Sequence, residues 1–164
     1  MPVNLELKVK INSTAKIEKI IKKEKINYKT VLKQKDIYYK YDKGLLKLRI
    51  ENGSFSLIKY KRDEKGKRFS NYDILDLKGK NVEMYLSEIL KVVAVVEKKR
   101  KLYIYNDTRI HLDTVKNLGS FLELETVVLH GKKHAENEFT EVVKMLNLDL
   151  SQQIKASYRN LIVK

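Results

Sequence analysis

The sequence predicts a single α+β domain, spanning residues 1–164, with about eight β-strands and several helices. Three observations carry this prediction. Apolar and polar residues alternate in several short runs, of which "NLELKVKI" at residues 4–11 is the clearest, and such alternation is typical of a strand with one apolar face. The dipeptide Asn52-Gly53 stands between two alternating runs and marks a β-hairpin. Other stretches repeat apolar residues at helical spacing.

The first half of the chain is predicted to contain one strand, one helix and four further strands. Residues 3–12 form the first strand, and Ser13-Thr14 then offers a helix cap. Isoleucines recur at helical spacing after this cap, so we expect the helix to continue to about residue 26. The four strand-like stretches that follow cover residues 32–42, 45–50, 55–62 and 70–77.

The second half predicts helices at both of its ends. A helix is expected over about residues 81–91, before the long strand "VVAVVEKKRKLYIY" at 92–105. The turn Asn106-Asp107 leads into a strand at 108–113, and "SFLELETVVL" at 120–129 forms the last clear strand. Two more helices are expected, at about 132–146 and 151–161.

Composition excludes several classes of protein. The chain has no cysteine, which excludes a disulfide framework, a thiol nucleophile and a cysteine-based metal site. No run approaches the ~20 apolar residues of a membrane span, and the N-terminus lacks an apolar signal core. We therefore expect a cytoplasmic protein without a membrane segment. The glycines form neither a P-loop nor a dinucleotide-binding pattern.

The net charge of +14 favours a polyanionic partner. Candidates are nucleic acid, a nucleotide, polyphosphate and an anionic membrane surface. The alternative is an ordinary lysine-rich surface, and total charge alone does not separate the two.

Charged residues recur on one face of successive predicted strands. Lys47 and Arg49 alternate with leucines, and Glu123 and Glu125 do the same near the end of the chain. An open sheet would show such faces to water. A closed barrel would instead pack its apolar faces against helices and turn the charged faces into its lumen, where a phosphate chain and a metal ion would complement them. Both arrangements fit the pattern.

A set of motifs occurs in an order shared with a known family. The motifs are "NLELKVKI", "LLKLRI" with the Asn-Gly turn, "IKYK", V-x-K-x-R-x-x-Y at 96–103, "IHLDTVKNLGSFLELE" at 110–125, and Ser157-Tyr158 with Leu161. Together they resemble the CYTH superfamily of triphosphate tunnel enzymes, and the run at 110–125 most resembles the class IV adenylyl cyclase-like branch. The resemblance spans nearly the whole chain. It implies a closed antiparallel barrel of eight strands with flanking helices, whose lumen binds a triphosphate.

The resemblance also implies roles for individual side chains. Glu6, Glu123 and Glu125 would be metal-binding carboxylates, with Mg²⁺ or Mn²⁺ as the cofactor. Glu6, Glu123 and Asp113 would be catalytic. Phosphate oxygens would be bound by Lys8, Lys10, Lys47, Arg49, Lys59, Lys61, Lys98 and Arg100. Asp73 stands where the family often has a further acid.

The implied activity is that of a metal-dependent enzyme acting on a nucleoside triphosphate or an inorganic triphosphate, either an adenylyl cyclase-like lyase or a triphosphatase. One residue departs from the family pattern. Asn4 stands where the first Glu of the ExExK signature belongs, and an amide oxygen brings no negative charge to a metal site. This departure supports an alternative, a non-catalytic protein on the same fold that binds nucleotides, polyphosphate or RNA. Nucleic acid is a secondary candidate partner, and a homodimer is an open alternative because barrels with exposed apolar flanks often pair.

The three histidines predict no metal motif. His111 shares strand alternation with Asp113, but a surface position is the favoured interpretation. His130 and His134 are four residues apart, yet Gly131 intervenes and His130 closes a strand, so no zinc site is expected.

Overall fold

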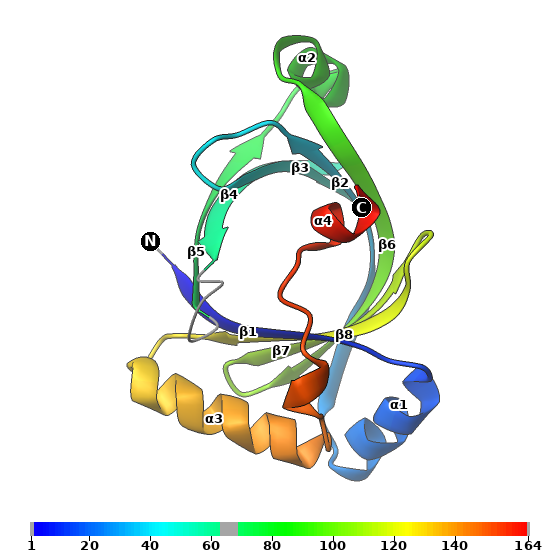
Figure 1. Ribbon diagram of the computed structural model, residues 1–164, viewed down its shortest axis with the longest axis vertical. Coiled ribbons are helices and arrows are strands. Elements are labelled where there is room, and N and C mark those ends of the chain that lie inside the picture. Colours follow the sequence, from blue (N-terminus) through cyan, green and yellow to red (C-terminus); the bar gives the residue numbers. More distant parts are fainter. Residues whose placement is uncertain (1, 63–68, 164) are drawn as a thin grey trace.

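The computed structural model describes residues 2–62 and 69–163 and shows a ring of antiparallel strands closed on itself (Figure 1). In spatial order the strands are β1-β5-β4-β3-β2-β6-β7-β8, and β8 pairs with β1 to complete the barrel. The strands are β1 Val3–Lys10, β2 Asn27–Tyr39, β3 Leu45–Glu51, β4 Ser54–Arg62, β5 Phe69–Leu77, β6 Val92–Tyr105, β7 Thr108–Val115 and β8 Gly119–Val127. The closed eight-stranded barrel is therefore confirmed, and the open sheet is excluded.

The helices follow the predicted order except at the C-terminus. They are α1 Thr14–Lys23, α2 Val82–Ile89, α3 Lys132–Met145, the short 3-10 helix η1 Leu150–Gln152, and α4 Tyr158–Ile162. The single helix predicted at 151–161 is wrong, because residues 153–157 run extended along β1. Their backbone bonds with that strand, such as Ile154 N to the carbonyl of Lys8 at 2.8 Å, replace helical ones. Within the described ranges, no helix has the length and apolar character to cross a bilayer.

The largest apolar core lies outside the ring, between β1, β7, β8 and the helices α1 and α3 (Figure 1). Leu5 and Leu7 of β1 point into it, and Ile17 of α1 and Phe139 of α3 pack there. Because successive side chains of a strand point to opposite faces, Glu6 and Lys8 must then point into the barrel. The alternation in "NLELKVKI" thus directs charge inward.

A second helix contact covers the opposite side of the ring. Val82 and Leu86 of α2 pack against Ile37, Tyr39 and Leu48 of β2 and β3. The turn between β3 and β4 has positive φ at both Asn52 (50°) and Gly53 (77°), which is the geometry of a tight hairpin and confirms the predicted one.

The C-terminal segment crosses the ring, and α4 lies within the outline of the strands (Figure 1). Tyr158 and the partly buried Leu161 pack against Ala94, Val96 and Phe121, which lie at one end of the barrel. The segment therefore fills that end with apolar side chains and leaves the remaining lumen as a cavity.

Candidate active site in the barrel lumen

The lumen forms a cavity of about 320 Å³ lined by side chains of all eight strands and of the C-terminal segment. The register of β1 and β8 sets Glu6 opposite Glu125 and Lys8 opposite Glu123. Directly opposed residues of an antiparallel pair share a face, so these four charged side chains form one wall of the cavity.

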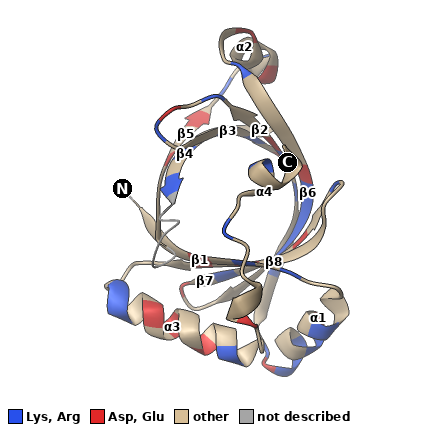
Figure 2. Cartoon of the chain, viewed as in Figure 1, with Lys and Arg blue, Asp and Glu red and all other residues tan. Residues whose placement is uncertain are grey.

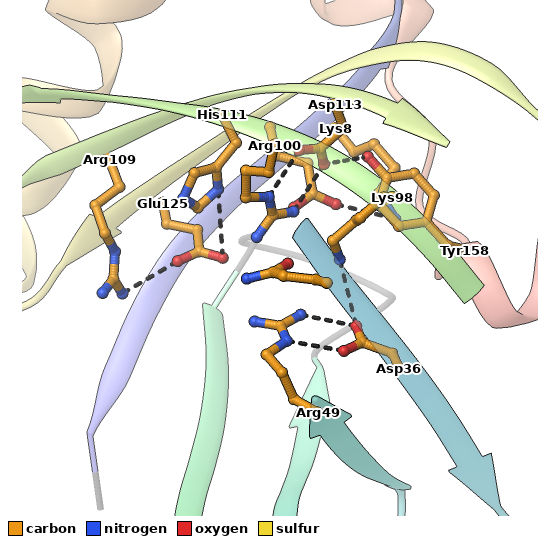
Figure 3. A network of polar contacts seen from close by, with 12 residues as sticks. Lys8, Asp36, Arg49, Lys98, Arg100, Arg109, His111, Asp113, Glu125 and Tyr158 are labelled. Carbon is orange, nitrogen blue, oxygen red and sulfur yellow. Dashed lines mark hydrogen bonds and ion pairs between the residues drawn. The ribbon is translucent and has the colours of Figure 1, made fainter. Parts of the chain in front are cut away.

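The basic wall of the cavity converges on Asp36 of β2 (Figure 3). Arg49 donates two hydrogen bonds of 2.8 Å to its carboxylate, and the ammonium groups of Lys47 and Lys98 lie 3.2 Å and 3.3 Å from Oδ2. Burial favours the protonated acid, but the three cations outweigh burial and hold the pKa of Asp36 well below its usual range. Asp36 is not among the site residues predicted from the sequence.

The two lysines of this wall, Lys47 and Lys98, have lowered pKa values. Burial lowers the pKa of Lys98 to about 7; repulsion by Arg100 adds to the shift, and Asp36 opposes it. Burial and Arg49 lower the pKa of Lys47 to about 8 in the same way. A further anion in the lumen would favour the charged form of both lysines.

Arg100 of β6 lies between the cations around Asp36 and the carboxylates of Asp113 and Glu123. Its Nε and Nη2 each lie 2.7 Å from an oxygen of Asp113, and Nη2 also donates to Glu123 at 2.8 Å. The hydroxyl of Tyr158 donates to the same Asp113 at 2.7 Å. Burial raises the pKa of Glu123, but Lys8 and Arg100 outweigh burial and keep it well below its usual range, so the carboxylate is ionised.

A compact group of possible metal ligands lies beside Arg100. One ligand atom each from His111, Glu123 and Glu125 lies within 4.8 Å of the other two. His111 is only 4% exposed, so the surface position predicted for it is wrong. Burial and Arg100 lower its pKa to about 4, which leaves the imidazole neutral near pH 7. Arg109 Nη2 lies 3.1 Å from Glu125.

Two buried acceptors indicate that this group fits a divalent metal ion. Among the residues described, neither Asn4 Oδ1 nor His111 Nδ1 has a hydrogen-bond partner, and both side chains line the cavity. Imidazole nitrogen, carboxylate oxygen and amide oxygen are all ligands of divalent ions. Glu6 lines the same cavity and faces Glu125 in register, but it is not part of the compact group.

Three of the predicted site residues lie on the outer face of the barrel. Lys59 pairs with Asp73 at 3.8 Å, and both side chains are more than half exposed. Lys61 shares their face and is also exposed. The inward orientation predicted for them is wrong because water, not a helix, meets the outer face here. Lys10 lies at the exposed end of β1, with its ammonium 5.8 Å from the Phe121 ring, and does not line the cavity.

Positive charge is not confined to the lumen. Figure 2 shows Lys and Arg on the strands of the ring and also on the helices outside it. The helix α1, "TAKIEKIIKK", alone carries four lysines outside the barrel. The lumen cations named above, in contrast, each have a carboxylate partner. Each lumen cation therefore lies beside a carboxylate, although Lys47, Arg49 and Lys98 share Asp36 and still repel one another.

The CYTH domain family profile matches residues 3–158. The chain belongs to the CYTH family. A protein of Methanocaldococcus jannaschii, provisionally named an adenylate cyclase, is 29% identical over 174 residues, which cover 97% of this chain and 98% of the relative.

Several proteins of known structure share the fold. The PH1012 protein from Pyrococcus horikoshii has a TM-score of 0.85 and 21% identity, with 96% of this chain and 98% of that chain covered. An adenylyl cyclase candidate from Hippeastrum, described as having a dominant triphosphatase activity, has a TM-score of 0.64 and 13% identity, with 98% and 94% covered. The family profile confirms the predicted resemblance to the CYTH superfamily, and these structures confirm the fold.

Proposed function

We propose that this CYTH protein is a metal-dependent enzyme that processes the triphosphate group of a nucleotide. One observation carries the proposal. One cavity sets the cations Lys47, Arg49, Lys98 and Arg100 against the possible metal ligands His111, Glu123 and Glu125. Phosphate oxygens favour guanidinium and ammonium groups, so a phosphate chain lying between the two walls would contact both.

The chain's own residues would supply binding and orientation. Lys47, Arg49 and Lys98 would exchange part of their contact with Asp36 for phosphate oxygens, in positions that are already fixed before substrate binds. Asp113 accepts two hydrogen bonds from Arg100 and is fully buried, which suits a residue that positions Arg100. A divalent ion, held by His111, Glu123 and Glu125, would supply neutralisation of the charge that develops on phosphate oxygens.

An apolar side of the lumen favours an organic triphosphate over an inorganic one. The inward faces of β4 and β5 present Ile58 opposite Ile74 and Tyr60 opposite Tyr72. Ile74 is 51% exposed although it lines the cavity, so its side chain is accessible. A nucleobase can stack on such aromatic and apolar side chains, whereas tripolyphosphate has no group that would gain from them.

Two reactions fit this site. In a hydrolase, water attacks the terminal phosphoryl group and releases phosphate. In a cyclase, the ribose 3′-hydroxyl attacks the α-phosphate and releases pyrophosphate. The names of the relatives point to both, since the M. jannaschii protein is named for the cyclase and the Hippeastrum protein is described by its triphosphatase activity.

A non-catalytic binder is the second candidate, and Asn4 favours it. Asn4 brings a neutral oxygen to the wall where the family signature has a carboxylate. A site with one fewer charge would hold a metal ion less tightly and would bind a triphosphate with little turnover.

Product identity tests the proposal. Purified protein is incubated with ATP, thiamine triphosphate or tripolyphosphate in the presence of Mg²⁺ or Mn²⁺, and phosphate, pyrophosphate and cyclic AMP are quantified. We expect turnover of ATP at a lower KM than that of tripolyphosphate. Lys47→Met is expected to reduce turnover, and Lys59→Met, the same change on the outer face, is expected to have no effect. Saturable binding of ATP without any product would favour the binder instead.

The cytoplasmic location and the homodimer expected from the sequence stay predictions.

A further inference from the structure

His111 is a buried polar residue whose surroundings do not satisfy it. It lies on the inward face of β7, opposite Leu102 of β6 and Glu123 of β8. Leu102 offers no hydrogen bond. Nδ1 lies 3.9 Å from Glu125 Oε1, too far for a hydrogen bond, and within the described part of the chain it has no other partner. A buried polar atom left without a partner destabilises the fold, so this one calls for an explanation.

The space between His111 and Glu125 suits one metal ion. Bonds from nitrogen and carboxylate oxygen to a transition-metal ion are about 2.0–2.2 Å long, so an ion between Nδ1 and Oε1 can reach both atoms across 3.9 Å. Arg109 holds the other oxygen of Glu125 at 3.1 Å, which keeps Oε1 on the side of His111. Glu123, the third member of the group, is held in place by Arg100 at 2.8 Å.

A second buried acceptor, Asn4 Oδ1, lies in the same cavity. Its side chain is 4% exposed and lines the same cavity, and its Oδ1 also has no hydrogen-bond partner among the residues described. Asn4 lies opposite Val127, so the register sets it two residues along the wall of the cavity from Glu125.

We propose that His111 is a metal ligand through Nδ1 and that the site it forms with Glu123 and Glu125 prefers divalent first-row transition-metal ions to Mg²⁺. Mg²⁺ is bound almost entirely by oxygen, whereas an imidazole nitrogen is a favourable ligand for ions from Mn²⁺ to Zn²⁺. This inference rests on the proposed function, because it assigns the metal of the same lumen.

Magnetic resonance of bound Mn²⁺ tests the assignment without any substrate. Pulsed EPR of the Mn²⁺-loaded protein is expected to show hyperfine coupling to one imidazole ¹⁴N nucleus, and His111→Asn is expected to abolish it. Titration calorimetry with Mn²⁺, Co²⁺ and Mg²⁺ gives the second readout. We expect His111→Asn to weaken Mn²⁺ and Co²⁺ binding by about tenfold or more and to leave Mg²⁺ binding nearly unchanged. His134→Asn, the same change at an exposed position of α3, is the matched control.

The outcomes separate this inference from the proposed function. Absence of ¹⁴N coupling in the wild type overturns the inference whether or not the variant folds, and turnover of ATP with Mg²⁺ in the same protein would then leave the proposed function standing. Coupling that disappears in His111→Asn supports the inference, even if no triphosphate is converted to product. Equal binding of Mn²⁺ and Mg²⁺ by the wild type would contradict the preference.

Discussion

The carboxylate of Asp36 lies at the centre of three cations in the wall of the lumen. Arg49 donates one hydrogen bond to each of its oxygens, and the ammonium groups of Lys47 and Lys98 lie close to Oδ2. Each buried charge carries a desolvation cost of several kcal/mol, and only close partners offset it. Asp36 therefore holds these cations in place before substrate arrives, and a phosphate chain would compete with it for them.

The lowered pKa values of the lumen lysines predict that triphosphate binding takes up protons. Near pH 8, Lys98, with a pKa of about 7, is mostly neutral, and Lys47, with a pKa of about 8, is half charged. A polyanion beside them raises both pKa values, so the bound state holds more protons than the free state. Affinity should therefore fall as pH rises from about 7 to 9, by up to about tenfold per pH unit for each lysine. The terminal phosphate, whose pKa is about 6, is already ionised in this range.

Calorimetry in buffers of different ionisation enthalpy measures this proton uptake. Lys98→Met should reduce the uptake at pH 8, and Lys59→Met on the outer face should not change it. Proton release on binding, or uptake that is equal in the wild type and in Lys98→Met, would show that Lys98 does not meet the phosphate chain.

Asn4→Glu is expected to tighten metal binding. Asn4 and Glu6 leave the same face of β1, and both side chains line the cavity. The substitution adds an anionic oxygen where an amide oxygen has no hydrogen-bond partner within residues 2–62 and 69–163, and lumen cations such as Lys8 favour its ionised form. Titration of Mn²⁺ with a non-hydrolysable triphosphate present should show a clear gain in affinity. Asn4→Gln, which adds the length without the charge, controls for shape, and equal affinities of the two variants would exclude a direct contribution of position 4 to the metal site.

Glu123→Gln is expected to lower kcat by roughly two orders of magnitude or more, because it removes one charge from the metal site and several kcal/mol of transition-state stabilisation with it. The fold should survive, since Asp113 still holds Arg100. Steady-state kinetics with ATP and Mn²⁺ measures the effect. Glu97→Gln, on the outer face of β6 where Glu97 pairs with Lys116, is the matched control. Wild-type turnover in Glu123→Gln would show that Glu123 has no part in the metal site.

At the scale of single elements, strand alternation predicted the direction of side chains well where a helix covers the barrel. On β1 and β8 the apolar residues meet α1 and α3, so the charged residues point inward as expected. On β4 and β5 the rule fails. Ile58 and Tyr60 point inward while Lys59 meets water, because the outer-face residues of these strands that pack in the cluster with α2 are Phe55, Leu57 and Leu77, and Lys59 lies beyond them. No sequence pattern states which strands a helix will cover.

Two side chains of the site escaped prediction for different reasons. Asp36 shares alternation with Gln34 and Tyr38 and could have been found from the strand pattern alone, since the opposite face carries Ile37 and Tyr39. His111 was predicted at the surface, with the lumen as the alternative, and the register of β7 with β8, which sets it opposite Glu123, decides for the lumen.

The C-terminal segment is the element that closes one end of the lumen, and Tyr158 attaches it to the site. Its hydroxyl donates to Asp113 at 2.7 Å, its ring packs against Phe121 at 5.1 Å, and Lys8 lies 4.0 Å from the ring centre. Burial, together with Glu123 and Asp113, raises the pKa of Tyr158 well above its usual range, so it remains a donor.

Tyr158→Phe is expected to lower the free energy of unfolding by about 1.5 kcal/mol, because it removes one hydrogen bond to a charged group and keeps the ring. Urea unfolding followed by circular dichroism measures the change. Tyr85→Phe, at a position that is 67% exposed, should leave stability unchanged. Equal stabilities of the two variants would mean that the hydroxyl of Tyr158 contributes nothing to docking the segment.

At the scale of the whole molecule, the barrel separates two populations of positive charge. Lumen cations are buried and paired with carboxylates, whereas the lysines of α1 and of the outer strands face water. Salt screens exposed charges over a Debye length of about 8 Å at physiological ionic strength but reaches buried pairs much less. The two populations should therefore respond differently to polyanions and to salt.

A nucleoside triphosphate with Mn²⁺ is expected to raise the melting temperature. A ligand that binds only the native state, at 100 times its Kd, adds about 2.7 kcal/mol of stability, which for a chain of this size corresponds to roughly 5–10 °C. The shift should persist in 300 mM salt, because the lumen shields its cations. Long RNA, which can reach only the outer lysines, should bind weakly and lose its effect as salt rises, since its affinity depends on released counterions. Thermal unfolding with each ligand at low and high salt distinguishes the two surfaces. If RNA raised the melting temperature and the triphosphate with Mn²⁺ did not, the polyanion site would lie on the outside of the barrel, and the lumen charges would serve the fold alone.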